Sequence, residues 1–205
     1  MNAEENLAQI AEQVSTCTAC KLHSSRKHAV PGEGPVHADL IFIGEGPGFH
    51  ENEQGRPFVG AAGKFLEELL GTIGLSREDV FIGNVIKCRP PGNRDPMLDE
   101  IEACTPYLER QIEVINPKVI ITLGRFSMAR YFPEAKISQI HGQPKEINGR
   151  LIVPMYHPAA ALHQPSLRET VKSDFAKLPG LIESGVSADP PDDTDGSDPE
   201  QLSLF

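Results

Sequence analysis

Four short apolar runs alternate with segments whose apolar residues recur at helical spacing. The apolar runs cover residues 39–44, 80–85, 118–124 and 150–156. Short continuous apolar runs predict strands that are buried on both faces, as in a parallel sheet. Helical spacing predicts helices over residues 61–71, 98–115, 125–131 and 166–175. Strands that alternate with helices indicate a single three-layer α/β domain, which we place at residues 1–182.

The composition changes sharply after this domain. Residues 183–200 are rich in Pro, Gly, Ser and Asp and contain few large apolar side chains, so we predict a disordered acidic linker. The net charge is −10, but seven of the 29 acidic residues lie in 183–205, which has no Lys or Arg. The rest of the chain is close to neutral, so binding to nucleic acid is not excluded.

The ends of the chain carry no membrane or export signal that we can identify. No run of about 18 apolar residues is present, so we expect no membrane span. The first residues, MNAEENLAQIAEQ, are acidic and polar where a signal peptide would be basic and then apolar. We therefore expect a cytoplasmic protein.

Residues suited to chemistry follow each predicted strand. The first strand leads into Gly44–Gly48 (GEGPG), and the second ends at Asn84 with Lys87-Cys88-Arg89 beyond it. The third ends at Gly124-Arg125 and the fourth at His157-Pro158. Ligands of open α/β sheets bind beyond the carboxyl ends of the strands, so we predict one shared site there.

The four cysteines form a C-x-x-C pair, Cys17 and Cys20, and a widely spaced pair, Cys88 and Cys104. Structural disulfides are rare in a reducing compartment. Four thiols in two groups can bind zinc or a [4Fe–4S] cluster. The absence of a second C-x-x-C favours the cluster over zinc, and four buried free thiols remain an alternative.

Four motifs, taken together with the cysteines, resemble the family 4 uracil-DNA glycosylases. The motifs are Gly44–Gly48, Gly55–Gly60 (GRPFVG), Asn84–Pro91 (NVIKCRPP) and His157–Leu162 (HPAAAL). The resemblance covers roughly residues 10–180. It implies an αβα sandwich with a four-stranded parallel sheet, a [4Fe–4S] cluster on Cys17, Cys20, Cys88 and Cys104, and removal of uracil from deaminated DNA. A monomer acting on single- or double-stranded DNA is expected.

The resemblance also suggests how uracil is held. Such enzymes flip the base out of the helix into a pocket. Phe58 could stack on the uracil ring, and the Asn84 amide offers a donor for O4 and an acceptor for N3–H. His157 could donate to O2, where negative charge develops as the glycosidic bond breaks. Taken singly, each could equally be structural: a core phenylalanine, a strand-closing asparagine and a His-Pro turn.

Further roles fall to the glycine-rich motif and its neighbours. Glu45 could orient the attacking water or stabilise the sugar cation. The amides of Gly46 and Gly48 could bind the base or a phosphate. Glu51 matches a carboxylate that lies against uracil C5 and blocks the methyl group of thymine. A loop salt bridge for Glu45 and a solvated surface position for Glu51 are the structural alternatives.

One position departs from the family pattern. The leucine that fills the space of the flipped base commonly stands four residues after the motif histidine, but here that position is Ala161. We therefore expect either that Leu162 is the wedge or that wedging is weak. Basic residues in or near these loops could contact phosphates: Arg56, Lys87, Arg89, Arg94, Arg125 and Arg168.

The chain ends in a short apolar cluster, Gln201-Leu202-Ser203-Leu204-Phe205. It resembles the bacterial sliding-clamp-binding motif, and the acidic linker would present it to a partner as a tether. The alternative is a tail whose apolar end folds back on the domain.

Three other functions remain as alternatives. A glycosylase of the same fold with a broader range, including hypoxanthine, is the main one. A covalent uracil binder is disfavoured because residues 89–103 contain no histidine. The third alternative, an iron–sulfur electron carrier, would leave Phe58, Asn84 and His157 unexplained. A non-catalytic iron–sulfur protein that binds uracil-DNA would be a form of the second alternative.

Overall fold

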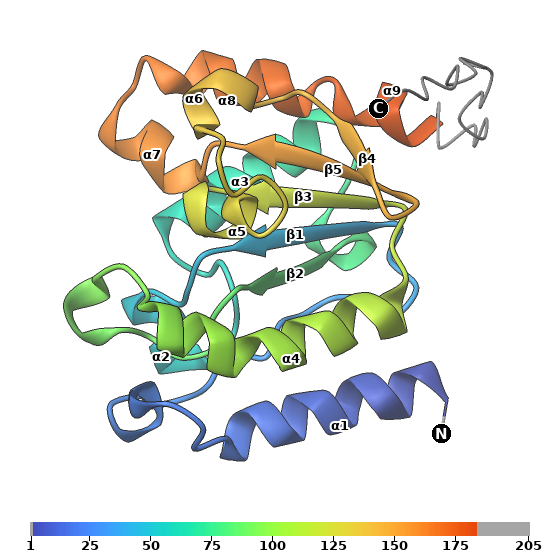
Figure 1. Ribbon diagram of the computed structural model, residues 1–205. Helices are drawn as coiled ribbons and strands as arrows, with labels where there is room; N and C mark the ends of the chain where they lie inside the picture. The colour runs from blue at the N-terminus through green and yellow to red at the C-terminus, as the bar shows by residue number, and fades with distance from the viewer. Residues whose placement is uncertain (1, 184–205) are drawn as a thin grey trace, which may run out of the picture.

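The computed structural model describes residues 2–183, which form a five-stranded sheet between layers of helices (Figure 1). The strand order is β2-β1-β3-β5-β4. The strands are β1 (Leu40–Gly44), β2 (Phe81–Asn84), β3 (Val119–Leu123), β4 (Lys145–Ile147) and β5 (Arg150–Met155). The first four strands of this order are parallel to one another, so the predicted αβα fold class is confirmed.

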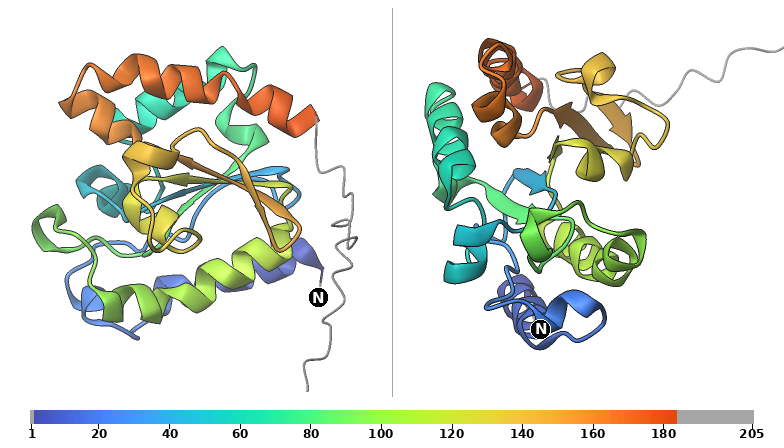
Figure 2. Two further views of the ribbon diagram at one scale, coloured as in Figure 1. Left: turned by 45° about the horizontal axis from the view of Figure 1, so that its top comes forward. Right: turned by 90° about the vertical axis from the view of Figure 1, so that its left-hand side faces the viewer.

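The helices cover both faces of the sheet. They are α1 (Ala3–Thr16), α2 (Phe49–Gln54), α3 (Ala61–Thr72), α4 (Leu98–Ile115), α5 (Arg125–Ala129), α6 (Ile137–Ile140), α7 (Pro158–His163), α8 (Leu167–Phe175) and α9 (Leu178–Glu183). Short 3-10 turns occur at Lys21–Ser24, Arg77–Asp79 and Pro91–Asn93. Helices α3 and α8 pack on one face and α4 on the other, with α1 outside α4 (Figures 1 and 2).

The predicted strand count was one too low. Strand β4 pairs antiparallel with β5 through a tight hairpin at Asn148-Gly149, and both turn residues have positive φ. The strand has three residues and a mostly exposed sequence, so it has no apolar run to detect. The Asn-Gly pair, a strong hairpin signal, could have revealed it.

The N-terminal segment forms a helix that the hydrophobic pattern did not predict. Asn2 and Glu5 form a reciprocal capping box, with hydrogen bonds of 2.9 and 2.8 Å. This Asn/Glu spacing is a recognisable start signal for a helix. Ile10 and Val14 are buried in the cluster that includes Leu108 of α4, so α1 is part of the folded domain.

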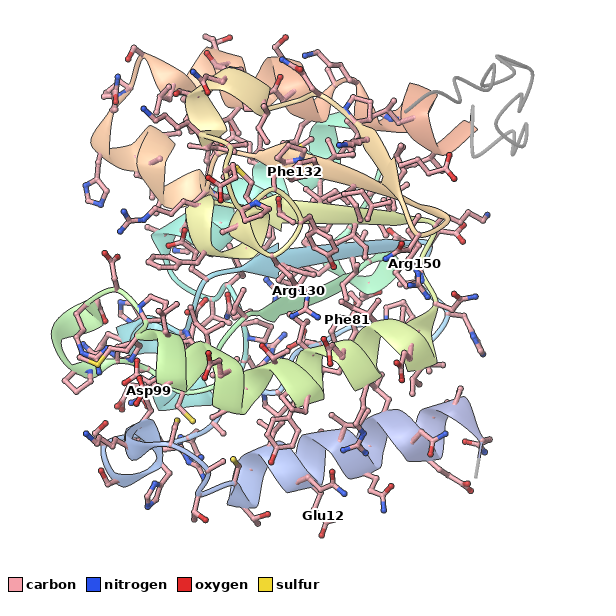
Figure 3. All side chains as sticks on the ribbon, in the orientation of Figure 1. Glu12, Phe81, Asp99, Arg130, Phe132 and Arg150 are labelled. Carbon is pink, nitrogen blue, oxygen red and sulfur yellow. The ribbon has the colours of Figure 1, made fainter. Side chains whose placement is uncertain are left out.

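Side chains of the central strands alternate between two apolar cores. Phe42 faces α8, where its ring stacks on Phe175 at 5.8 Å. Ile41 and Phe81 face α4, and Figure 3 shows Phe81 between the sheet and that helix. Burial on both faces explains why the strands are apolar throughout.

The packing brings the carboxyl ends of the parallel strands to one end of the molecule, beside α2 and α7 (left in Figure 1). Within the described residues, no helix has the length and apolarity required to cross a membrane. The predicted linker beyond residue 183 and the pentapeptide at 201–205 lie outside the described residues.

Candidate active site

A pocket of about 200 Å³ opens at the carboxyl end of the sheet, the end that faces the viewer in the right panel of Figure 2. It gathers six of the predicted site residues, five of them from the four motifs and one, Glu51, from the segment between the first two motifs. These are Gly46, Gly48, Glu51, Phe58, Asn84 and His157. Three of the four predicted strand ends therefore contribute to one pocket, whereas Gly124 and Arg125 after the third strand do not line it. The role of each residue stays a prediction.

Phe58 lies at the bottom of this pocket in a fixed backbone conformation. Its φ of 54° is rare for a bulky residue, and the side chain is only 2% exposed. Arg77 donates hydrogen bonds to the carbonyls of Phe58 and Pro57 at 2.9 and 2.6 Å. Gly63 allows α3 to approach, since a Cβ there would fall 1.6 Å from the Phe58 carbonyl oxygen. Backbone contacts thus hold the ring in place.

Asn84 ends β2 with its side chain buried in the pocket wall. Its Nδ2 group has no hydrogen-bond partner among residues 2–183, although the residue is only 1% exposed. A Cβ at Gly44 would fall 2.4 Å from Oδ1, so the glycine is needed for the amide to fit. A buried donor without a partner is costly, which indicates that a ligand completes it.

His157 follows β5 and stacks on Phe58, with ring centroids 5.4 Å apart. The Ala159 N–H donates to His157 Nδ1 at 3.1 Å, so Nδ1 carries no proton and Nε2 carries the proton of the neutral ring. Burial lowers the pKa of His157 to about 4, and the ring is neutral at pH 7. His157 is therefore prepared to donate from Nε2 without carrying a charge.

Glu51 connects two of the loops that form the pocket. The N–H groups of Gly48 and Phe58 each donate to one of its carboxylate oxygens. Burial raises the pKa of this carboxyl group, and those two amide donors oppose the rise. The solvated-surface alternative for Glu51 does not fit this placement, because the carboxylate is fixed in the lining of the pocket.

Glu45 lies in an adjoining cavity that shares Gly46 and Gly48 with the pocket. Its Oε1 accepts a hydrogen bond from the N–H of Phe126 at 3.2 Å. Burial raises its pKa, opposed first by the amides of Phe126 and Arg125. Glu45 was predicted to act on the attacking water or the sugar and not to bind the base; it does not line the base pocket, and its role stays a prediction.

The four cysteines line a second cavity, between α1, the loop after β2 and α4. None forms a disulfide, and Cys88 and Cys104 are buried. Arg26 donates to Cys88 Sγ at 3.2 Å, and the Ala19 N–H donates to Cys17 Sγ at 3.4 Å. Among residues 2–183, no three His, Cys, Asp or Glu side chains form a group that could hold a metal ion.

The basic residues that were predicted to contact phosphates differ in burial and in their charged partners. Lys87 was placed wrongly: it is 1% exposed, and its Nζ donates to Gln111 Oε1 at 2.7 Å. Burial lowers its pKa to about 8.

Four of the arginines are paired with carboxylates: Arg56 with Glu33, Arg94 with Glu100, Arg125 with Asp95 and Arg168 with Glu68. Arg89 has no acidic partner among residues 2–183.

The wedge positions differ clearly in exposure. Ala161 is buried at 3%, whereas Leu162 is 40% exposed on α7, the helix that His157 begins. Leu162 is thus the solvent-exposed residue of this pair, and its role as a wedge stays a prediction. Three residues at the pocket were not predicted: Phe49 and His50 line it, and Arg77 holds the backbone of Phe58. Phe49 and His50 directly follow the first motif but have no distinctive spacing, and Arg77 lies outside all four motifs.

Comparison with known proteins agrees with this geometry. The sequence model of the Uracil DNA glycosylase superfamily matches residues 31–178. A type-4 uracil-DNA glycosylase of Saccharolobus solfataricus is 50% identical over 190 residues, covering 88% of each chain. One of Sulfurisphaera tokodaii is 49% identical over 187 residues, 85% of this chain and 84% of the relative. One of Thermotoga maritima is 44% identical over 184 residues, which cover 87% of this chain and 96% of the relative.

A mostly parallel αβα sandwich with a pocket beyond the carboxyl ends of its strands has the site position that is usual for enzymes of the α/β class. The chain belongs to the uracil-DNA glycosylase superfamily. Within that superfamily it is similar to the type-4 enzymes over most of its length. The predicted family and the predicted enzyme class are confirmed.

Proposed function

We propose that this chain removes uracil from DNA by hydrolysing the bond between the base and the deoxyribose, leaving an abasic site. The observation that carries the proposal is the buried Nδ2 of Asn84, which has no hydrogen-bond partner in the described part of the chain and lies in the same pocket as His157. Uracil presents a carbonyl oxygen, O4, that such a donor would satisfy.

Recognition begins with a uracil flipped into the pocket. Asn84 Nδ2 donates to O4 and Oδ1 accepts from N3–H, a pattern that cytosine reverses. Phe58 supplies an apolar wall for the ring. Glu51, held by the N–H groups of Gly48 and Phe58, fixes the loop that closes the pocket near C5. The methyl group on C5 of thymine would clash with this fixed loop.

Bond cleavage places the electron pair of the C1′–N1 bond on the departing base. The charge spreads to O2, where His157 donates from Nε2. A water molecule then forms the new C1′–O bond, and the proton that it loses passes to the departing uracil anion, directly or by way of the Glu45 carboxylate. Glu45, oriented by the N–H of Phe126, is the carboxylate placed behind the glycine loop to order that water or to stabilise the sugar cation.

The test is excision from a labelled single-stranded oligonucleotide that contains one uracil, with thymine and hypoxanthine strands alongside. We expect abasic-site formation at uracil and none at thymine. Cleavage at hypoxanthine as well would keep the chemistry but establish the broader range. No product from folded, metal-loaded protein would refute the proposal and favour a binding role.

A [4Fe–4S] cluster on Cys17, Cys20, Cys88 and Cys104 is also part of the proposal. The four thiols line one cavity, and nitrogen donors point at two of the sulfurs, as suits thiolate ligands. A single zinc ion is less suitable, because its four sulfurs would have to converge within about 2.3 Å of one point. The bound cluster would supply a covalent link between the α1 segment and the loop after β2.

Replacing one of these ligands should remove the cluster. In Cys88→Ser we expect iron and acid-labile sulfide to fall to a small fraction of the wild-type content, and the melting temperature to drop, because α1 loses its link to the domain. Elemental analysis and thermal unfolding measure both. Full iron content in the variant would exclude Cys88 as a ligand, and bound zinc in the wild type would exclude the cluster.

The proposal extends to the last five residues as a sliding-clamp ligand. An acidic tether that ends in Gln201-Leu202-Ser203-Leu204-Phe205 can present Leu and Phe to an apolar pocket of a partner. Removing residues 201–205 should abolish binding to a purified bacterial clamp, measured by titration calorimetry. It should leave excision from short oligonucleotides unchanged. Equal clamp binding by the truncated protein would refute this role.

A further inference from the structure

An exposed aromatic ring stands at the mouth of the pocket. Phe49 begins α2, lines the pocket and is 52% exposed. The other exposed large apolar residues among those described are Met97, Leu98 and Leu162, and none of these lines the pocket. Single exposed apolar residues need no explanation, but an aromatic ring at the entrance to a base-binding pocket is placed to meet a base.

The guanidinium of Arg89 lies beside this ring, so the surface combines an aromatic ring with a positive charge. Its guanidinium carbon lies 5.3 Å from the centroid of the Phe49 ring, within cation–π range. Asn93 Oδ1 accepts from Arg89 Nε at 2.7 Å, which fixes the direction of the side chain. Within residues 2–183, Nε is the only guanidinium nitrogen of Arg89 with a hydrogen-bond partner. The terminal nitrogens are therefore available to an anion.

The position of this pair relative to α7 defines what it can touch. Residues of α2 and α7 both line the pocket, and the two helices stand apart at this end of the molecule (Figure 2, right). Leu162 is exposed on α7. A nucleotide that enters the pocket leaves its neighbours in the strand outside, at the entrance where Phe49 lies.

We infer that Phe49 and Arg89 form a binding site for a nucleotide next to the flipped uracil: Phe49 stacks on its base and Arg89 contacts its phosphate. This inference rests on the proposed function and deepens it by assigning a subsite outside the base pocket. Stacking on an aromatic ring tolerates any base, because every base has a π face. The subsite therefore favours single-stranded or locally unpaired DNA, in which the neighbouring base is free to stack.

Binding of a fluorescent strand tests the subsite without excision. The probe is a single-stranded oligonucleotide with a tetrahydrofuran abasic analogue in place of uracil and 2-aminopurine on its 5′ or 3′ side. Wild-type protein should quench one of the two positions, because one neighbour stacks on Phe49. Phe49→Ala should abolish the quenching and weaken affinity by roughly 5- to 150-fold, the range of one base–aromatic stack. Phe49→Tyr should retain both properties.

Salt dependence separates the two residues. Arg89→Gln should lower the slope of log affinity against log salt by about 0.7, the value for one phosphate contact on a single strand. Phe49→Ala should leave that slope unchanged. Leu98→Ala is the matched control, since Leu98 is 78% exposed but does not line the pocket, and its affinity should equal that of the wild type.

Unchanged affinity and quenching in Phe49→Ala would overturn the inference, and so would equal effects of Phe49→Ala and Leu98→Ala. The wild-type protein is assayed in parallel on the uracil strand. Absence of excision there would refute the proposed function, while the dependence of abasic-strand binding on Phe49 would still be measured. The two failures are therefore distinguishable.

Discussion

His157→Ala should slow uracil excision by about 10²- to 10³-fold, the usual effect of removing one donor from a site of developing negative charge. The Ala159 N–H holds Nδ1 as an acceptor, so the proton on Nε2 is directed away from the backbone. Single-turnover rates with saturating enzyme isolate the chemical step. DNA affinity should stay near the wild-type value, because O2 of the bound base gains most of its charge after binding.

The pH profile tests the same assignment in the wild-type protein. Since burial lowers the pKa of His157 to about 4, protonation of this ring should not affect excision as the pH falls from about 8 to about 6. An ordinary histidine, with a pKa near 6.5, would become charged over that interval. A rate change centred near pH 6.5 that disappears in His157→Ala would contradict the neutral-donor role, as would an unchanged rate in the variant.

The parallel core of the fold could be predicted because its strands are buried on both faces and therefore apolar throughout. Helix α4 was predicted with its observed bounds, since its apolar face repeats regularly and ends at Asn116 in a left-handed cap. Strand β4 could not be found in the same way. Its position depends on pairing with β5 through the Asn148-Gly149 turn, and not on burial of its own side chains.

The residues of the site that could be predicted are those that the parallel strand topology alone brings together. Asn84 and His157 follow strands whose carboxyl ends meet, so their proximity follows from the parallel sheet. The direction of the Lys87 side chain does not follow from its position along the chain. It lies three residues after Asn84, yet its side chain turns into the core toward Gln111 of α4. Only the packing of α4 distinguishes these two directions.

The separation of Glu45 from the base pocket was likewise not predictable from sequence. Glu45 and Gly46 are adjacent in one motif, but the loop directs the Glu45 carboxylate toward Phe126 and Gly124. A Cβ at Gly124 would fall 2.4 Å from Glu45 Oε1, so the approach requires glycine there. Two distant segments therefore determine which cavity the carboxylate reaches.

Asn84→Ala should lower kcat/KM for uracil excision by about 100-fold without a matching loss of stability. A donor and an acceptor lost against buried uracil atoms cost up to about 3 kcal/mol, which corresponds to this factor. Because Nδ2 has no partner among the residues that the structure describes, the substitution breaks no hydrogen bond of that group there. The melting temperature should thus remain near that of the wild type, which separates a recognition defect from misfolding.

Asn84→Asp should remove the preference for uracil over cytosine, which Asn84→Ala alone cannot show. A carboxylate has no N–H for O4 and places a negative charge against that oxygen, so uracil loses its donor and gains a repulsion. Cytosine presents an amino group at the same position, and a carboxylate oxygen accepts from it. Strands that carry uracil or cytosine at one site, compared by kcat/KM, measure the ratio. If the aspartate variant kept the wild-type ratio, the amide of Asn84 would not be what distinguishes the two bases.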